Sequence, residues 1–295
     1  MKIKNNYFKN KNIIITGGNQ GLGLELVKHF YSLGANIIVC ARNQKKLNNI
    51  KNNLKIRKSQ KIMIEKCDIS RSNHVDKLFS KIFKKFKKID ILINNAGIYG
   101  PKGSVETLLW NEIKKTFETN LFASIYLIKK IIPHFKKNNK GKIIQISGGG
   151  AAGPLPYFSA YASSKAAIVR FVENVSKELE SHKIYINAVA PGPINTRMLD
   201  EVLSENPETV GRSFYKKSIN QKKTGGTDMN KILKCIEFFC HKKSDGISGK
   251  LISVLWDDWH KFTNYKKILN KSDLGTIRRI AGRDRNINFF DKNEK

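Results

Sequence analysis

The sequence predicts an α/β fold: a doubly wound, seven-stranded parallel sheet with helices on both faces. Two observations predict it. Short apolar runs typical of buried parallel strands alternate with longer segments whose apolar residues have helical spacing. A glycine-rich turn joins the first apolar run to the first helical segment. Because strands that alternate with helices form parallel sheets covered on both faces, we expect one such sheet.

The first two elements show the pattern most clearly. The run NIIIT at 12–16 is apolar and is followed directly by glycines, as expected of a buried strand. Segment 22–34 carries apolar residues at Leu22, Leu26 and Phe30 and closes on Gly34, which predicts a helix. The full set of expected strands comprises residues 12–16, 36–41, 61–68, 89–97, 142–147, 184–192 and 250–256.

The chain is predicted to hold a single domain over residues 1–262, followed by a basic C-terminal extension at 263–295. A length of 295 residues is normal for one α/β domain with a large sheet, and the sequence shows no internal repeat. No apolar run approaches the ~20 residues that span a bilayer, and the N-terminus lacks the apolar stretch of a secretory signal. We expect a soluble, cytoplasmic protein without membrane insertion.

The formal charge of +31 raises the question of a polyanionic partner. The basic residues are 45 lysines to 10 arginines and are spread along the whole chain. Phosphate-reading surfaces favour arginine for its bidentate fork, so we expect a solvated lysine surface and no nucleic-acid partner. One local feature resists this interpretation: the last 18 residues hold four of the arginines, Arg278, Arg279, Arg283 and Arg285.

The four cysteines do not predict a metal site or a disulfide framework. They lack CxxC spacing, so we expect reduced and mostly buried thiols and no bound metal. The cysteines are Cys40, Cys67, Cys235 and Cys240.

The glycine-rich turn TGGNQGLG at 16–23 lies between the first predicted strand and the first predicted helix. Gly17, Gly21 and Gly23 allow the backbone to approach a pyrophosphate closely at the positive N-terminal end of that helix. The spacing is GxxxGxG, not the common GxGxxG. An ordinary turn with spare glycines would look similar, so the pattern depends on the segments that follow.

Five further motifs follow in a fixed order. Together with the glycine spacing they resemble the short-chain dehydrogenase/reductase family over about residues 10 to 256. The resemblance implies a Rossmann-like fold, NAD(P)-dependent activity on CH–OH and C=O groups, and a homodimer or homotetramer. The motifs are CDIS (67–70), NNAG (94–97), ETNL (118–121), YASSK (161–165) and PGPINT (191–196).

The resemblance also implies roles for single residues. Asp68 would contact the adenine, and Asn120 would hold a water that connects Lys165 to solvent. The implied catalytic set is Asn120, Ser147, Tyr161 and Lys165. The implied cofactor residues are Gly17, Asn19, Gln20, Gly21, Leu22, Gly23, Arg42, Asp68, Ile69, Asn95, Ala96, Gly97, Tyr161, Lys165, Pro191, Gly192, Ile194 and Thr196.

The pair Tyr161 and Lys165 also has a direct physical interpretation. Residues four apart lie on one face of a helix. A free tyrosine has a pKa near ~10 and is a poor acid–base group at neutral pH, but a nearby ammonium stabilises the phenolate and lowers that pKa. Tyr161 can then exchange a proton with a substrate oxygen while hydride moves to or from a nicotinamide. The alternative is that Tyr161 only packs among small residues.

The serine position departs from the family pattern. The family's catalytic serine lies thirteen residues before the tyrosine, where this chain has Gly148, and Ser147 is one residue earlier. Either the glycine-rich loop 148–150 bends so that Ser147 supplies the hydroxyl, which we favour, or the site lacks it. Ser159 is a weaker candidate because it lies too near the tyrosine.

The end of the second strand predicts the cofactor. Members that prefer NAD place an acidic residue there, whereas this chain has Ala41 followed by Arg42. An arginine pairs well with a 2′-phosphate, and no carboxylate opposes it. We therefore expect NADP(H) as the preferred cofactor, with NAD(H) possible. Asn43 and Lys46 would add contacts.

The substrate is the least determined feature. Residues 197–226 are expected to form a substrate lid, and they lack the uniform apolar character expected for a steroid or a long acyl chain. Trp256 and Trp259, which flank Asp257 and Asp258, suit a sugar ring, although tryptophans are just as common at a dimer interface. The C-terminal half also resembles family members associated with surface-polysaccharide genes. Together these features predict a sugar or nucleotide-linked sugar substrate.

Three other functions stay open at this point. The first is a 3-ketoacyl-thioester reductase. The second is a non-catalytic NADP(H)-binding regulatory protein, which a missing serine would favour. The third is a nucleic-acid binder, suggested by charge alone.

Overall fold

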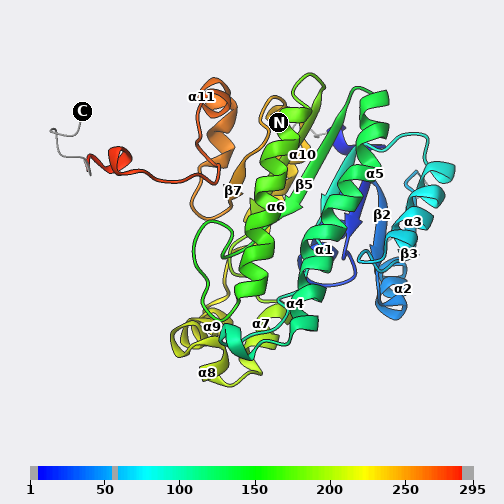
Figure 1. Cartoon of the computed structure of the whole chain (residues 1–295). Helices are drawn as coiled ribbons and strands as arrows, with labels where there is room; N and C mark the ends of the chain where they lie inside the picture. Colours follow the sequence, from blue (N-terminus) through cyan, green and yellow to red (C-terminus); the bar gives the residue numbers. More distant parts are fainter. Residues whose placement is uncertain (1–5, 55–58, 288–295) are drawn as a thin grey trace.

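The computed structural model describes residues 6–54 and 59–287, and it confirms the predicted α/β architecture. Seven parallel strands form one sheet in the order β3-β2-β1-β4-β5-β6-β7 (Figure 1). Six strands lie within the predicted runs, and β5 begins one residue earlier than predicted. The strands are β1 Asn12–Thr16, β2 Asn36–Ala41, β3 Ile62–Lys66, β4 Ile91–Asn94, β5 Gly141–Ile146, β6 Ile184–Ala190 and β7 Leu251–Ser253.

Helices cover both faces of this sheet, because the central strands are apolar on both sides. In β1, Ile13 and Ile15 pack into a core shared with α1 and α10, whereas Ile14 packs into a core shared with α3, α5 and α6. The helices are α1 Gly21–Ser32, α2 Gln44–Asn53, α3 Ser72–Lys85, α4 Trp110–Phe117, α5 Ala123–Lys137, α6 Ser159–Glu178, α7 Arg197–Leu203, α8 Pro207–Val210, α9 Arg212–Thr224, α10 Met229–Cys240 and α11 Lys266–Lys271.

The strand order places a crevice between β1 and β4, where the connections leave the sheet in opposite directions. In open α/β sheets, ligands bind at the carboxyl ends of the strands beside such a switch point. The segment predicted as a lid contains α7, α8 and α9, which gather together at one end of the molecule (Figure 1).

The segment after α11 is tied to the edge strand β7 and to α6. The amide of Leu251 donates to the carbonyl of Gly275 (2.7 Å), and the ammonium of Lys250 donates to the carbonyls of Ser272 and Leu274. On α6, the carboxylate of Glu173 accepts from the amide of Ile277 (2.6 Å). The division into a domain at 1–262 and an extension at 263–295 stays a prediction.

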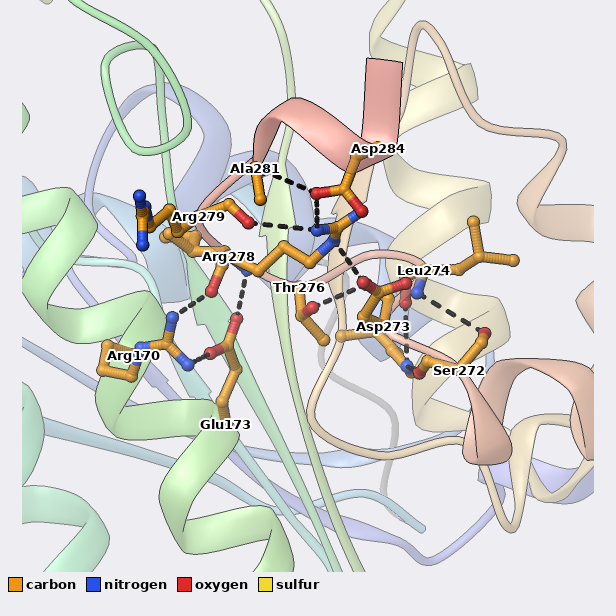
Figure 2. A network of polar contacts seen from close by, with 12 residues as sticks. Arg170, Glu173, Ser272, Asp273, Leu274, Thr276, Arg278, Arg279, Ala281 and Asp284 are labelled. Carbon is orange, nitrogen blue, oxygen red and sulfur yellow. Dashed lines mark hydrogen bonds and ion pairs between the residues drawn. The ribbon is translucent and has the colours of Figure 1, made fainter. Parts of the chain in front are cut away.

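Arginines of the extension take part in this network (Figure 2). Arg278 pairs with Asp273 and with Asp284, and Arg170 of α6 pairs with Glu173. The predicted arginine cluster therefore has carboxylate partners within the chain at Arg278.

Among the described residues, no helix combines the length and apolar character needed to cross a bilayer. All four cysteines are free and buried, as predicted.

Candidate active site

A single cleft of about 1050 Å³ collects the predicted site residues. All of the predicted cofactor residues line it, and so does Ser147. Residues from seven separate segments of the sequence therefore meet at one place, which the linear order alone does not require. Asn120 lies just outside the lining, behind the cleft wall.

The glycine turn forms a cradle that side chains would fill. Gly17 has a φ of +65°, a conformation that L-residues rarely adopt. A Cβ placed at Gly23 would lie 2.2 Å from the carbonyl oxygen of Gly17. The turn can therefore pass this close to α1 only with glycine at these positions. The residues present fit a pyrophosphate at the N-terminus of that helix.

The far end of the cleft holds the residues predicted to select the cofactor. Arg42 is exposed and follows β2 directly. The side chain of Asn43 caps α2 by accepting from the amide of Lys46 (3.0 Å), and the ammonium of Lys46 donates to Gln20 (2.6 Å). Asp68 accepts from the amide and hydroxyl of Ser70, so one of its oxygens stabilises its own turn.

The strand end at 94–97 is held to the glycine turn by hydrogen bonds. The hydroxyl of Thr16 accepts from the amides of Asn95 (3.0 Å) and Ala96 (3.1 Å), and the side-chain amide of Asn95 donates to the carbonyl of Thr16 (2.9 Å). These contacts hold the end of β4 against the end of β1, beside the crevice between the two strands.

Asn120 lies in a π-helical turn, Glu118–Phe122, between α4 and α5. Such turns are often found at functional sites. Its side chain is fully buried: the oxygen accepts from the amide of Ile98 (2.9 Å), and the nitrogen donates to the carbonyl of Ile98 (2.8 Å) and to the hydroxyl of Ser164 (3.0 Å). A Cβ at Gly97 would lie 3.2 Å from the Asn120 oxygen and 3.4 Å from Lys165 Nζ. Asn120 and Lys165 therefore face the same point.

Tyr161 and Lys165 lie one turn apart in the first half of α6, and both are buried. Lys165 Nζ is 5.6 Å from the centre of the Tyr161 ring and donates to the carbonyl of Ile146 (3.1 Å). The helix brings the pair into the cleft together, as the four-residue spacing predicts. The packing-only alternative for Tyr161 is weakened by its place in the cleft lining.

Burial changes the acid–base properties of this pair. It lowers the pKa of Lys165 from 10.5 to about 8. Burial, together with the neighbouring Tyr99, raises the pKa of Tyr161 above its usual value. In the protein alone, desolvation thus outweighs the ammonium, and the phenol is protonated at neutral pH. This is the form that gives a proton to a carbonyl.

Position 148 faces the phenol. A Cβ at Gly148 would lie 2.1 Å from Tyr161 Oη. Ser147 is buried, and its amide donates to the carbonyl of Val189 (2.8 Å). Its Oγ has no hydrogen-bond partner among the residues that the structure describes. The catalytic role of Ser147 stays a prediction.

Sequence reasoning missed Tyr99. Its ring packs edge-on against that of Tyr161, with 4.8 Å between the centroids. Tyr99 follows the NNAG motif by two residues, so its place at the end of β4 was the available signal. Ser164 was also missed, although its position inside YASSK places it one turn below the tyrosine; it anchors Asn120.

Beyond Tyr161 the cleft wall is largely apolar. It includes Tyr99, Leu155, Met198, Val202 and Phe214, several of which share one buried cluster with the tyrosine. The last three come from the α7–α9 segment, so the predicted lid does contribute to the cleft.

The two tryptophans predicted to hold a sugar are not arranged as a pair. Trp256 lines the cleft and is 87% exposed, whereas Trp259 packs on Phe238 with 5.9 Å between the ring centroids. The carboxylate of Asp257 accepts from the amide of Ser253 (2.7 Å). Only Trp256 is therefore free to meet a ligand in the way the sugar hypothesis requires.

The fold, the glycine cradle and the Tyr161–Lys165 pair together define a dinucleotide-dependent oxidoreductase class. Residues 11–207 match the family model described as short chain dehydrogenase. The chain therefore belongs to the short-chain dehydrogenase/reductase family.

Relatives from bacteria and animals support this assignment. The chain is 31% identical to "Dehydrogenase/reductase SDR family member 7B" of Bos taurus over 71% of this chain and 64% of that protein. It is 32% identical to "Fatty acyl-CoA reductase" of Acinetobacter baylyi over 65% of each chain, so it spans slightly less than two thirds of these two relatives. It is 29% identical to 7alpha-hydroxysteroid dehydrogenase of Escherichia coli K12 over 82% of this chain and 91% of that protein.

Solved structures agree. A 7 alpha-hydroxysteroid dehydrogenase complexed with NADH and 7-oxo glycochenodeoxycholic acid superposes with a TM-score of 0.74 at 27% identity, covering 86% of this chain and 96% of that one. An actinorhodin polyketide ketoreductase with NADPH has a TM-score of 0.73 at 20% identity, which supports the fold alone.

Proposed function

We propose that this protein is an NADP(H)-dependent oxidoreductase that interconverts a ketone and a secondary alcohol. One observation carries the proposal: α6 places Tyr161 and Lys165 in the same cleft as the glycine cradle of residues 17–23. A proton donor and a dinucleotide site in one cleft are what hydride transfer to a carbonyl needs.

The chain's own groups supply the proton and orient the reaction. A bound nicotinamide would give hydride to the carbonyl carbon or accept it from the alcohol. Tyr161, protonated at neutral pH, donates its proton to the carbonyl oxygen as negative charge develops there. Lys165, with a pKa of about 8, still carries its charge at neutral pH and stabilises the phenolate that results. Asn120 holds the backbone of Ile98 beside this pair.

The preference for NADP(H) rests on charge at the end of β2. Arg42 and Lys46 line the cleft there, and Ala41 takes the place where NAD-preferring members have a carboxylate. Two cations without that carboxylate favour a 2′-phosphate.

The apolar wall beyond Tyr161 favours a ketone on a hydrophobic carbon skeleton. Leu155, Val202 and Phe214 offer apolar surface rather than hydrogen-bond partners. Relatives named for hydroxysteroid and fatty-acyl substrates support the same class. The sugar hypothesis is left with the exposed Trp256 and has less support.

A 3-ketoacyl-thioester reductase is the second candidate, because an acyl chain also fits an apolar wall. The non-catalytic alternative predicts NADPH binding without turnover of any carbonyl.

The test is a substrate panel. Wild type and Tyr161→Phe are mixed with NADPH and with bulky cyclic ketones, an acetoacetyl thioester or a nucleotide-linked ketosugar, and NADPH absorbance is followed. We expect wild type to oxidise NADPH in the presence of the cyclic ketones. Tyr161→Phe should lower the rate of NADPH oxidation about 10³-fold. Full turnover by Tyr161→Phe would refute the mechanism, and NADPH binding without any turnover would favour the regulatory alternative.

The assembly is proposed to be a homodimer or homotetramer in the cytoplasm. Exposed apolar side chains near α4 and α5, among them Leu109, Trp110 and Phe122, support self-association. Sedimentation analysis would decide between one, two and four copies.

A further inference from the structure

Gly148 is in unusually close contact with the hydroxyl of the proposed proton donor. A Cβ at this position would lie 2.1 Å from Tyr161 Oη and 3.1 Å from Cζ. The first distance is far inside any van der Waals contact. No side chain fits at residue 148 while the phenol stays where it is.

The phenol is held in that place by packing. The Tyr161 ring is 6% exposed and lies in one cluster with Phe158, Val202 and Val210, and its edge meets Tyr99. The ring cannot swing away without opening this cluster. A side chain at residue 148 would therefore have to displace either the ring or the end of β5.

Ser147 does not supply a hydroxyl bonded to the phenol in this arrangement. Its amide continues the β5–β6 ladder to Val189. Its Oγ is buried and has no hydrogen-bond partner among the described residues, so it makes no hydrogen bond to Tyr161.

We propose that Gly148 is a positioning residue: because it has no side chain, the Tyr161 hydroxyl can occupy the space that a side chain at residue 148 would fill. The reacting oxygen then meets one hydroxyl, that of Tyr161, instead of a tyrosine and a serine hydroxyl. This inference rests on the proposed function and deepens it. Of the two interpretations of the serine position, it selects the site without a catalytic serine. Restoring a serine at residue 148 then harms the enzyme, because the new side chain displaces the proton donor.

The first test does not depend on turnover. Thermal unfolding is measured for Gly148→Ala, Tyr161→Phe and the double variant. We expect Gly148→Ala alone to lower Tm by about 4 °C, and by less than half as much in the Tyr161→Phe background. Without Oη, the nearest Tyr161 atom to the new Cβ is 3.1 Å away. The matched control is Gly149→Ala, where a Cβ meets nothing within 4 Å. Equal losses in both backgrounds, or no loss, would overturn the proposal.

The second test uses turnover with NADPH and an accepted ketone. We expect Gly148→Ser to lower kcat about 10²-fold while KM for NADPH changes less than about 3-fold, since only the proton donor moves. Gly149→Ser should lower kcat much less than Gly148→Ser does. Ser147→Ala should also lower kcat less than Gly148→Ser does. An unchanged or higher kcat in Gly148→Ser would overturn the inference. If wild type reduces no carbonyl, the proposed function fails, and the thermal cycle still decides the role of Gly148.

Discussion

Replacing Lys165 by methionine should make the protein more stable at neutral pH while removing its activity. Lys165 is 3% exposed, and its ammonium has no carboxylate partner among the described residues; its hydrogen bond goes to the carbonyl of Ile146. Burial lowers its pKa from 10.5 to about 8, and a difference of ~2.5 units at ~1.36 kcal/mol each corresponds to about 3 kcal/mol. This is the free-energy cost of keeping the charged form in the folded protein.

The methionine variant avoids this cost and loses one hydrogen bond worth about 1 kcal/mol. The side-chain amide of Gln145 also donates to the Ile146 carbonyl (3.1 Å), so that oxygen keeps a partner. Methionine has a similar volume and fits a buried site. The net expectation is a gain in unfolding free energy of roughly 2 kcal/mol near pH 7.

The pH dependence gives the sharper assay. Between pH 8 and 10.5 the unfolded chain binds a proton at residue 165 that the folded chain does not, so wild-type stability from this site rises with pH. It is highest above about pH 10.5, falls as pH drops from 10.5 to 8, and is constant below 8. The gain of roughly 2 kcal/mol in Lys165→Met should therefore change by about 3 kcal/mol and become a loss of roughly 1 kcal/mol between pH 7 and pH values above about 10.5. Urea unfolding of cofactor-free wild type and Lys165→Met at several pH values measures the difference in their unfolding free energies. The contributions of the other lysines are the same in both proteins and cancel in this difference.

Lys177 on the same helix is the matched control, because its side chain is 71% exposed. Lys177→Met should stay within ~0.5 kcal/mol of wild type at every pH. The reasoning is refuted if Lys165→Met is no more stable than wild type near pH 7, or if its advantage is independent of pH. Loss of turnover in a stabilised variant would be a trade of stability for function.

Three further predictions concern separate parts of the molecule. Arg42→Ala should raise the Kd for NADPH by about 10- to 100-fold, through loss of a charge-assisted hydrogen bond, and the Kd for NADH by less than about 3-fold; equal effects on both would contradict a 2′-phosphate role. Asn120→Ala should lower Tm by about 4 °C and kcat as well, because it removes the bonds to Ile98 and Ser164; an unchanged Tm would speak against this anchoring. Glu173→Ala should speed tryptic cleavage of the C-terminal extension about tenfold by releasing the amide of Ile277, and an unchanged rate would show that other contacts hold it.

Much of this architecture was predictable because its signals are local. The apolar runs around Ile13–Ile15 and the glycines between β1 and α1 each constrain a strand or a turn directly, and a parallel sheet follows from their alternation. The four-residue spacing of Tyr161 and Lys165 likewise fixes their common face. Tyr99 was not predictable in this way. Its contact with Tyr161 joins segments far apart in the chain, and its place two residues after NNAG does not by itself show that its ring reaches Tyr161.

The serine position shows where sequence matching reaches its limit. Counting thirteen residues back from Tyr161 identifies Gly148 as the departure, and a neighbouring serine then looks like a substitute. That choice assumes that a loop can shift a side chain by one residue. The backbone of Ser147 is held in the ladder by its bond to Val189, and a catalytic role for its hydroxyl stays a prediction. A Cβ at residue 148 would lie 2.1 Å from Tyr161 Oη, which gives the glycine a reason of its own: the volume is already occupied by the group that carries the proton.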